Sequence, residues 1–354
     1  MKTLKEAYKN YFTIGAAVAA HWLDEAAECV KANFSTVTAE NEMKYVGIHP
    51  HDYDKPDFRK IRELEKEGKK PEPPVIRDRE QFVHPAKCVD FAPADKIYNF
   101  ARDNGILVRG HTLSWHGSYP WGIFDQLTSE ELMTNTREHY ALVSEHFPDC
   151  YCWDVVNEAI NDKEGEAIRK TVYKDKFGED YLYTLYAMAR EYFPKAELCC
   201  NDYNEYNPMK RERILNLVNN LKDRGLVDVI GCQCHVNAFL NEKNFDEIKR
   251  SYDMYAETGL KIHVTEMDVN CVDWDHPGEI TAEAVKKVPE VYARLFEIFR
   301  QYKGVIENVT LWGVSNKYSW LNHFKLQGKV VENCPLLFDK DYQPTEAFYR
   351  VTEF

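Results

Sequence analysis

Eight short apolar segments, each followed by a longer stretch with helical periodicity, constrain the fold of this chain more than any other feature. The segments are residues 14–18, 35–39, 107–113, 152–156, 197–200, 229–234, 261–265 and 308–313. Short apolar runs that alternate with 3.6-period segments predict βαβ units and a parallel sheet. Eight such units predict a closed (β/α)8 TIM barrel, an α/β fold, and a chain of 354 residues has a suitable length for it. We expect one domain over residues 1–354.

The stretches between these segments carry ordinary helix signals. Amphipathic helices are expected at residues 94–104, 129–146, 208–223, 245–257 and 282–301. Gly105 follows the first of them, where a glycine commonly ends a helix. Ser129 is followed by two glutamates, which the dipole favours at a helix N-terminus, and Pro208 stands in a first turn.

One connection is too long for a plain loop. Roughly 65 residues separate the second and third candidate strands, well beyond the usual connector length. Residues 49–89 contain a charged, helix-like piece at 57–67 and a cluster of three prolines at Pro71, Pro73 and Pro74. We expect an insertion at about residues 50–89. It is either a lid over one end of a cleft or a solvated excursion, and the excursion is favoured.

Charge and cysteine usage exclude several classes of protein. The formal net charge of -13 argues against binding to nucleic acid, which would be repelled. No run of about 18 apolar residues exists, so no membrane span is expected. The apolar residues 14–20 are too few for a signal peptide. The ten cysteines form no CxxC pair, which favours buried free thiols in a reducing cytoplasm. Oligomeric state is not readable.

Chemically versatile residues follow the candidate strands. These are Glu40 and Asn41, His111, Asn157 and Glu158, Asp202 to Asn204, Gln233 and His235, Glu266 and Asp268, and Trp312. The carboxyl ends of parallel barrel strands converge on one face, so we expect these side chains to share a site. Glu158 and Glu266 stand out, because two facing carboxylates are the minimum equipment for cleaving a glycosidic bond. No metal or other cofactor is required for that reaction.

Side-chain alternation brings three of these residues together. Successive residues of a strand point to opposite faces, so Gln233 and His235 share a face, as do Glu266 and Asp268. His235, Glu266 and Asp268 can therefore lie side by side on neighbouring strands. A histidine between two carboxylates would orient one of them as a nucleophile.

Several motifs closely resemble those of glycoside hydrolase family 10, the retaining endo-β-1,4-xylanases, and in particular its intracellular bacterial branch. They fall in family order and cover the chain from about Phe12 onwards. The stretches are residues 38–44, 109–116, 153–159, 201–204, 231–235, 264–268, 312–314 and 319–320. The resemblance implies hydrolysis of internal bonds of xylan or xylo-oligosaccharides by double displacement.

The resemblance also implies a role for each matched residue. Glu158 matches the general acid/base, Glu266 the nucleophile and Asn157 the donor to the sugar 2-hydroxyl. His235 and Asp268 match the partners that orient the nucleophile. The substrate-binding positions are Gln233 beside the nucleophile, Lys44, His111 and Trp115 around the sugar on the non-reducing side, Glu40 and Asn41 at the next sugar, Tyr203 near the active centre, and Trp312 and Trp320 as indole walls.

The chain departs from the family pattern at a few positions. Ser118 stands where glutamine is usual, and Asn316 where aspartate is usual, so a contact to an outer sugar and a local charge pair are expected to be missing. Thr345 and Glu346 follow Pro344 where a lysine is common. These changes bear on chain-length preference and leave the reaction class intact.

Three alternatives remain open from the residues. The first is a β-1,4-glucanase or a mixed xylanase/cellobiohydrolase-type activity on the same scaffold, since glucose adds only a hydroxymethyl group. The second is a metal-dependent barrel enzyme such as a sugar isomerase, with ligands drawn from His111, Glu158, Asp202, His235, Glu266 and Asp268. The third is a non-catalytic sugar-binding protein.

Overall fold

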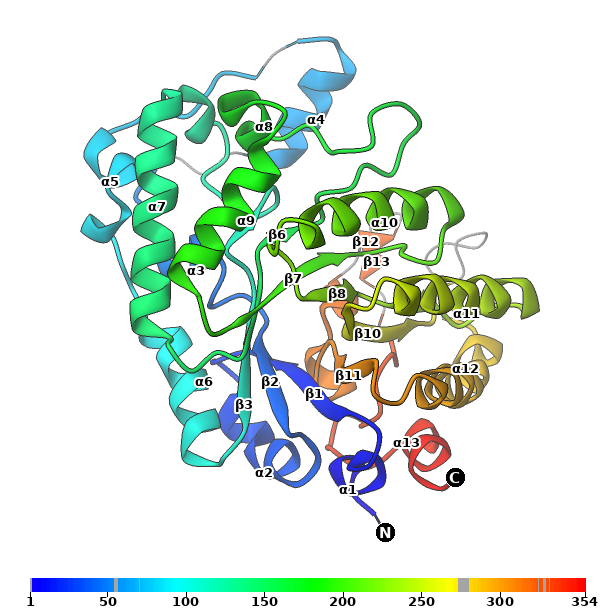
Figure 1. Ribbon diagram of the computed structural model, residues 1–354. Coiled ribbons are helices and arrows are strands. Elements are labelled where there is room, and N and C mark those ends of the chain that lie inside the picture. The colour runs from blue at the N-terminus through cyan, green and yellow to red at the C-terminus, as the bar shows by residue number, and fades with distance from the viewer. Residues whose placement is uncertain are drawn as a thin grey trace.

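Eight parallel strands form a closed barrel surrounded by helices (Figure 1). The computed structural model describes residues 2–53, 57–69, 71–272, 280–323, 325–326, 329–330 and 332–354. The barrel strands are β1 (Thr13–Val18), β2 (Thr36–Ala39), β3 (Leu107–Gly110), β5 (Cys152–Asp154), β7 (Glu197–Asp202), β8 (Val229–Cys232), β10 (Lys261–Asn270) and β11 (Ile306–Leu311). Each strand pairs with the next in this order, and pairing of β10 with β11 and of β11 with β1 closes the ring. The predicted barrel is confirmed.

Six of the eight barrel strands end at a residue other than the predicted one, and the largest differences, at the third and seventh strands, lie beside the candidate site. The third strand stops at Gly110, and the chain then forms the short strand β4 (Ser114–Trp115), which pairs with β6 (Val156–Asn157). A side chain at Gly110 would collide with the Trp153 indole, so only glycine lets the strands approach here. The seventh strand runs past its predicted end because β9 (His235–Asn237) pairs with its last residues.

The helices cover the outside of the barrel. They are α1 (Leu4–Tyr8), α2 (Leu23–Asn33), α3 (Tyr45–Ile48), α4 (Phe58–Lys66), α5 (Arg79–Val83), α6 (Ala92–Asp103), α7 (Ser129–His146), α8 (Val172–Phe177), α9 (Tyr181–Tyr192), α10 (Pro208–Lys222), α11 (Glu242–Glu257), α12 (Ala282–Gln301) and α13 (Glu346–Thr352). The predicted bounds of α7 and α12 agree with the structure. Thr128 caps α7, and its hydroxyl accepts a hydrogen bond from the backbone N–H of Glu131. A short hairpin pairs β12 (Lys325–Leu326) with β13 (Lys329–Val330). No helix in the described part of the chain is long and apolar enough to cross a membrane.

The long segment between β2 and β3 is partly docked on the barrel's helical layer. Helix α4 lies within the predicted charged piece. Helix α5 packs against α7, with Phe82 buried and the Arg79 guanidinium 2.8 Å from a Glu131 carboxylate oxygen. His49 is buried as well, and its Nε2 lies 2.9 Å from Nδ1 of His139. Within residues 79–87, Phe82 and Pro85 are buried and attach the segment to the barrel's helical layer, whereas the other residues are half-buried or exposed.

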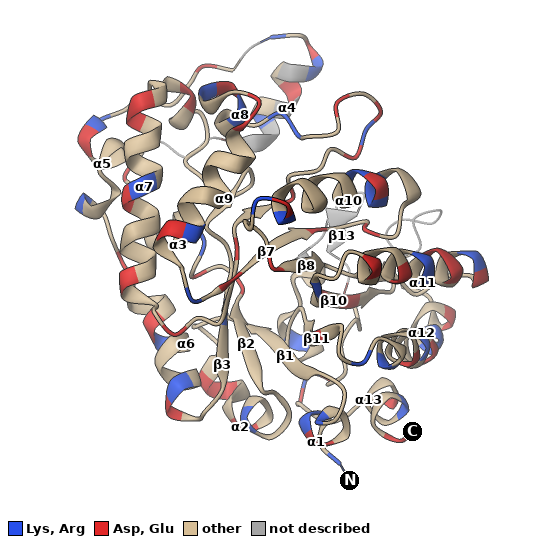
Figure 2. Ribbon diagram, in the orientation of Figure 1, with Lys and Arg blue, Asp and Glu red and all other residues tan. Residues whose placement is uncertain are grey.

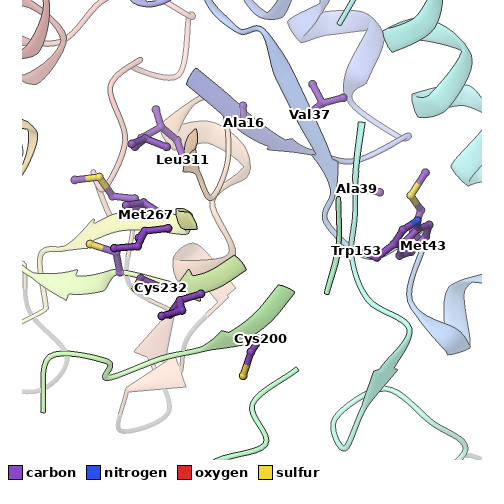
Figure 3. Packing of buried hydrophobic residues seen from close by; sticks show 14 of the residues in the cluster. Ala16, Val37, Ala39, Met43, Trp153, Cys200, Cys232, Met267 and Leu311 are labelled. Carbon is purple, nitrogen blue, oxygen red and sulfur yellow. The ribbon is translucent and has the colours of Figure 1, made fainter. Parts of the chain in front are cut away.

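The barrel and its helices share one large apolar core, part of which Figure 3 shows around Ala16, Val37 and Leu311. Lys, Arg, Asp and Glu residues lie mainly on the outer helices (Figure 2). Arg109 is an exception: it is fully buried and forms a two-pronged ion pair with the equally buried Asp154. Burial opposes ionisation of Asp154, but the charge of Arg109 and the hydrogen bond from His111 lower its pKa to about 2.

Candidate active site

A cavity of about 410 Å³ opens at the carboxyl ends of the barrel strands. Its lining is Glu40, Asn41, Lys44, His111, Trp115, Asn157, Glu158, Tyr203, Asn204, Gln233, His235, Glu266, Trp312 and Trp320. The cavity brings together the residues expected at the strand ends except Asp202, which pairs with Lys210, and Asp268, which lies behind His235. Asn204, which was expected at this rim but was given no role, lines the cavity as well. Convergence follows from the parallel barrel, since each strand delivers its last residues to the same face.

The Glu266 carboxylate is buried and is contacted by two polar side chains. Its Oε1 accepts a hydrogen bond of 2.7 Å from the Asn201 amide, and its Oε2 lies 3.3 Å from Nε2 of His235. The other imidazole nitrogen of His235 lies 3.0 Å from Asp268, whose second oxygen accepts a hydrogen bond of 2.7 Å from the Trp320 indole. The side-by-side arrangement expected for His235, Glu266 and Asp268 is thus present.

This arrangement favours an ionised Glu266. Burial would raise the pKa of its carboxyl, but the hydrogen bond from His235 and the charges of His111 and His235 bring the pKa below its usual value. Burial would likewise lower the pKa of His235, but Asp268 and Glu266 together raise it to about 10. At neutral pH, His235 is therefore an imidazolium between two carboxylates, and it donates a hydrogen bond to each.

Glu158 faces the same cavity from the end of β6. Its Oε1 accepts hydrogen bonds from the amides of Asn157 at 3.3 Å and Gln233 at 3.2 Å, and its Oε2 accepts one from the Trp115 indole at 3.0 Å. Gln233 thus contacts Glu158 through its side chain, whereas its backbone carbonyl accepts the N–H of Glu266. These three donors lie on three different strands or strand extensions. The position of the Glu158 carboxyl therefore depends on how those strands pack together.

Asn201 links the two glutamates and was missed as a site residue. Its amide N–H2 donates both to Glu266 and to Asn157, at 2.7 Å and 2.8 Å, while its oxygen accepts a hydrogen bond of 2.6 Å from Thr265. A continuous amide chain therefore runs from Glu266 through Asn201 and Asn157 to Glu158. The available signal was a polar residue directly after the apolar residues Leu198–Cys200.

One wall of the cavity combines a cation with aromatic rings. The Lys44 ammonium donates a hydrogen bond to Asn41 and lies 4.9 Å from the ring centroid of Trp115. Burial lowers the pKa of Lys44, and the nearby carboxylates Glu266, Glu40 and Glu158 partly oppose that effect. Burial raises the pKa of Glu40.

His111 and Trp312 continue this wall. Their rings meet edge to face at 5.3 Å, and Nδ1 of His111 lies 2.8 Å from the Asp154 carboxylate. Indole faces beside polar donors suit a sugar ring, which has C–H-rich faces and hydroxyls at its rim.

Two departures from the family pattern can be placed. The Ser118 hydroxyl is buried and makes no hydrogen bond to any described residue. Asn316 is buried too, and its side-chain oxygen accepts the N–H of Leu336 at 2.9 Å. Position 316, where the family pattern has an aspartate, therefore carries a neutral amide that cannot form a charge pair.

The metal-enzyme hypothesis finds no ligand cluster at this cavity among the residues that the structure describes. The clustered group with suitable ligand atoms is Glu197, His263 and Glu307, which lies near the beginnings of barrel strands β7, β10 and β11. The Lys261 ammonium already pairs with both of these glutamates.

Comparisons with known proteins agree with the geometry. The profile described as Glycosyl hydrolase family 10 matches residues 3–354. A "Beta-1,4-xylanase" of Dictyoglomus thermophilum is 36% identical over 99% of this chain and 91% of that protein, and "Endo-1,4-beta-xylanase B" of Paenibacillus barcinonensis is 35% identical over 99% and 97%.

Solved structures give the same result. Xylanase XynB from Paenibacillus barcinonensis, complexed with a conduramine derivative, superposes with a TM-score of 0.84 at 34% identity, covering 99% of this chain and 98% of that one. TsXylA, an intracellular xylanase from Thermoanaerobacterium saccharolyticum, gives 0.79 at 29% identity, with 99% and 98% covered. The match spans the barrel and every strand that delivers a residue to the cavity, and the chain therefore belongs to glycosyl hydrolase family 10.

Proposed function

We propose that this protein is a retaining endo-β-1,4-xylanase that hydrolyses internal β-1,4-xylosidic bonds of xylan or xylo-oligosaccharides. The observation that carries the proposal is the placement of Glu158 and Glu266 in one cavity with different surroundings. Glu266 is buried against an imidazolium, which favours the carboxylate form. Glu158 is reached by three neutral N–H donors and no side-chain cation within hydrogen-bonding distance among the described residues.

In the first step, Glu266 attacks the anomeric carbon while Glu158 protonates the departing glycosidic oxygen. A covalent glycosyl-enzyme forms and the leaving sugar diffuses away. Asn157 donates to the 2-hydroxyl of the sugar at the cleavage point, a contact that strengthens as oxocarbenium character develops. Asn201 holds the Asn157 amide at the right orientation through its own N–H2.

In the second step, Glu158 acts as a base toward water, which attacks the same carbon and releases Glu266. Glu158 gave its proton to the leaving group in the first step, so it is now a carboxylate and can take a proton from the attacking water. Two inversions at one carbon give retention.

The remaining cavity residues bind the chain. Lys44, His111 and Trp115 contact the sugar on the non-reducing side of the scissile bond, and Glu40 and Asn41 the sugar beyond it. Residues Tyr203, Gln233, Trp312 and Trp320 bound the active centre. Relatives named as xylanases favour this substrate over a β-1,4-glucan.

We further propose that residues 1–354 form one catalytic domain with an insertion at about residues 50–89. We also propose that the protein is located in the cytoplasm. All ten cysteines are free and most of them are buried, which suits a reducing compartment. An intracellular xylanase is also among the structural neighbours. The charge of -13 opposes nucleic acid as a partner.

The decisive experiment is Glu266→Ala with and without azide, assayed on an aryl β-xylobioside. We expect turnover to fall by at least about 10⁴-fold, and azide to restore a fraction of it with an α-xylobiosyl azide product identified by NMR. The small anion occupies the space of the deleted carboxylate. Near wild-type activity of this variant would remove the proposed function, and so would an anomeric product of inverted configuration from the unaltered protein.

A further inference from the structure

A buried ammonium lies beside the loop that carries Glu158. Lys210, in the first turn of α10, is 1% exposed. Its Nζ pairs with Asp162 at 2.6 Å and with Asp202 at 2.8 Å, and it lies 3.5 Å from the ring centroid of Tyr203. The chemistry described above uses neither Lys210 nor the two aspartates.

Each of these aspartates ties down a different part of the chain around Glu158. Asp202, at the end of β7, accepts the backbone N–H of Ile160 at 2.9 Å. Asp162 accepts hydrogen bonds from the Arg169 guanidinium at 3.0 Å and from the Tyr203 hydroxyl. Lys210 joins the two carboxylates, so it fastens the loop after β6 to the end of β7.

Arg169 connects this network of ion pairs to Glu158 itself. Its Nε donates a hydrogen bond of 3.0 Å to the backbone carbonyl of Glu158, and its terminal nitrogen donates one of 3.1 Å to that of Ile160. On the other side, the Glu158 N–H donates to the Asn201 carbonyl at 2.9 Å. The backbone of Glu158 is thus held at both its N–H and its C=O.

The conformation of Glu158 explains why such fastening is needed. Its φ is +57°, in the left-handed region that a residue with a side chain enters only at a cost in free energy. Such a conformation persists where the surroundings over-determine it. The backbone dihedral aims the side chain, so relaxation to an ordinary conformation would swing the carboxyl away from the Trp115 and Gln233 donors.

The charges of the network also balance. Lys210 and Arg169 supply two positive charges, and Asp162 and Asp202 two negative ones. Burial raises the pKa of Asp202 to about 6, with Lys210 acting in the opposite direction. Without Lys210, a buried carboxyl beside Glu158 would lose its partner and the loop its link to β7.

We propose that Lys210 is a positioning residue for Glu158, acting through Asp162, Asp202 and Arg169 to hold the Glu158 carboxyl where the leaving oxygen departs. This inference rests on the proposed function. A misplaced acid matters only when the leaving group needs a proton. Loss of Lys210 therefore weakens hydrolysis of poor leaving groups and spares good ones, whereas a general structural loss affects both equally.

The test measures kcat/KM for phenyl and 2,4-dinitrophenyl β-xylobiosides with Lys210→Met. We expect about a 10- to 100-fold loss on the phenyl substrate, the range for a misplaced catalytic group, and under about 3-fold on the dinitrophenyl substrate. Asp162→Asn provides a second variant on a partly exposed loop and should give the same pattern if Lys210→Met does not fold. Lys261→Met is the matched control, because Lys261 also pairs with two carboxylates but lies at the start of β10.

Equal losses on both substrates, or no loss on the phenyl substrate, overturn the positioning role. A control variant with the same leaving-group pattern also overturns it. Failure of the unaltered protein to hydrolyse either substrate removes the proposed function, and this inference with it, and is distinguished by the wild-type rates alone.

Discussion

In the proposed mechanism, the charge of His235 sets how far the pH can fall before Glu266 is protonated and activity is lost. Replacing His235 by glutamine keeps an N–H donor near Oε2 of Glu266 but removes the positive charge. Two unit charges 3.3 Å apart interact by about 5 kcal/mol at an effective dielectric constant of 20. Desolvation of the buried imidazolium offsets much of this, and an opposite charge at such a distance commonly changes a carboxyl pKa by about 1–3 units.

The sign follows from the ionisation that the reaction needs. As the proposed nucleophile, Glu266 must be a carboxylate, and the imidazolium stabilises that form. In His235→Gln the acidic limb of kcat/KM should therefore move to higher pH by about 1–3 units. Asp268, left without its cation, adds a like charge that acts in the same direction. The double variant His235→Gln/Asp268→Asn removes both charges, so its limb should lie between those of the wild type and the single variant.

The assay is the pH dependence of kcat/KM on 2,4-dinitrophenyl β-xylobioside from pH 3.5 to 8. This leaving group departs without a proton, so the acidic limb reports Glu266 and is insensitive to Glu158. Thermal unfolding at each pH separates loss of the nucleophile from loss of the fold. An active single variant whose acidic limb coincides with that of the wild type would refute the reasoning.

Three further changes probe other parts of the molecule. Arg109→Met leaves the buried Asp154 without its guanidinium partner and with only the contact to His111, so urea unfolding should show a loss of about 3–5 kcal/mol, and a loss below 1 kcal/mol would contradict this. His49 and His51 are buried, which lowers the pKa of each to about 4, so the unfolded chain binds more protons between pH 6.5 and 4. The free energy of unfolding should decrease by up to about 3 kcal/mol per histidine as the pH is lowered from 6.5 to 4. The decrease should be smaller in His51→Phe, and an equal decrease in the variant and the wild type would argue against the lowered pKa of His51. Trp320→Ala should raise kcat/KM on aryl cellobioside relative to aryl xylobioside by about 10-fold, and an unchanged ratio would show that this indole does not exclude the glucose hydroxymethyl group.

The positions of the barrel strands and the two glutamates could be read from the chain because their signals are local. An apolar β-branched run between turn residues predicts a strand at any place in the chain. In a parallel barrel, the residue at the carboxyl end of such a strand lies on the rim. Alternation along strands was enough to put His235, Glu266 and Asp268 on one side of the cavity. The resemblance to a known family then supplied roles that spacing alone does not.

Contacts between distant loops could not be read in this way. The Trp115 indole donates to Glu158, and Lys210 reaches Asp162, only because β4 pairs with β6 and α10 follows β7 around the closed ring. The packing of α5 on α7 was missed for a similar reason, since a charged segment rich in proline gives no local sign of the surface that will cover Phe82.

By itself, the order of residues determined a parallel eight-stranded barrel and the identity of the two carboxylates on its rim. Those properties depend on apolar periodicity and on the direction of each strand, and both can be recognised within a few consecutive residues of the sequence. Only the tertiary structure decided that Asn201 would bridge Asn157 and Glu266, and that Glu158 would be held in a left-handed conformation. Hydrogen-bond strength changes over tenths of an ångström, and such distances exist only once the ring has closed and its loops have packed.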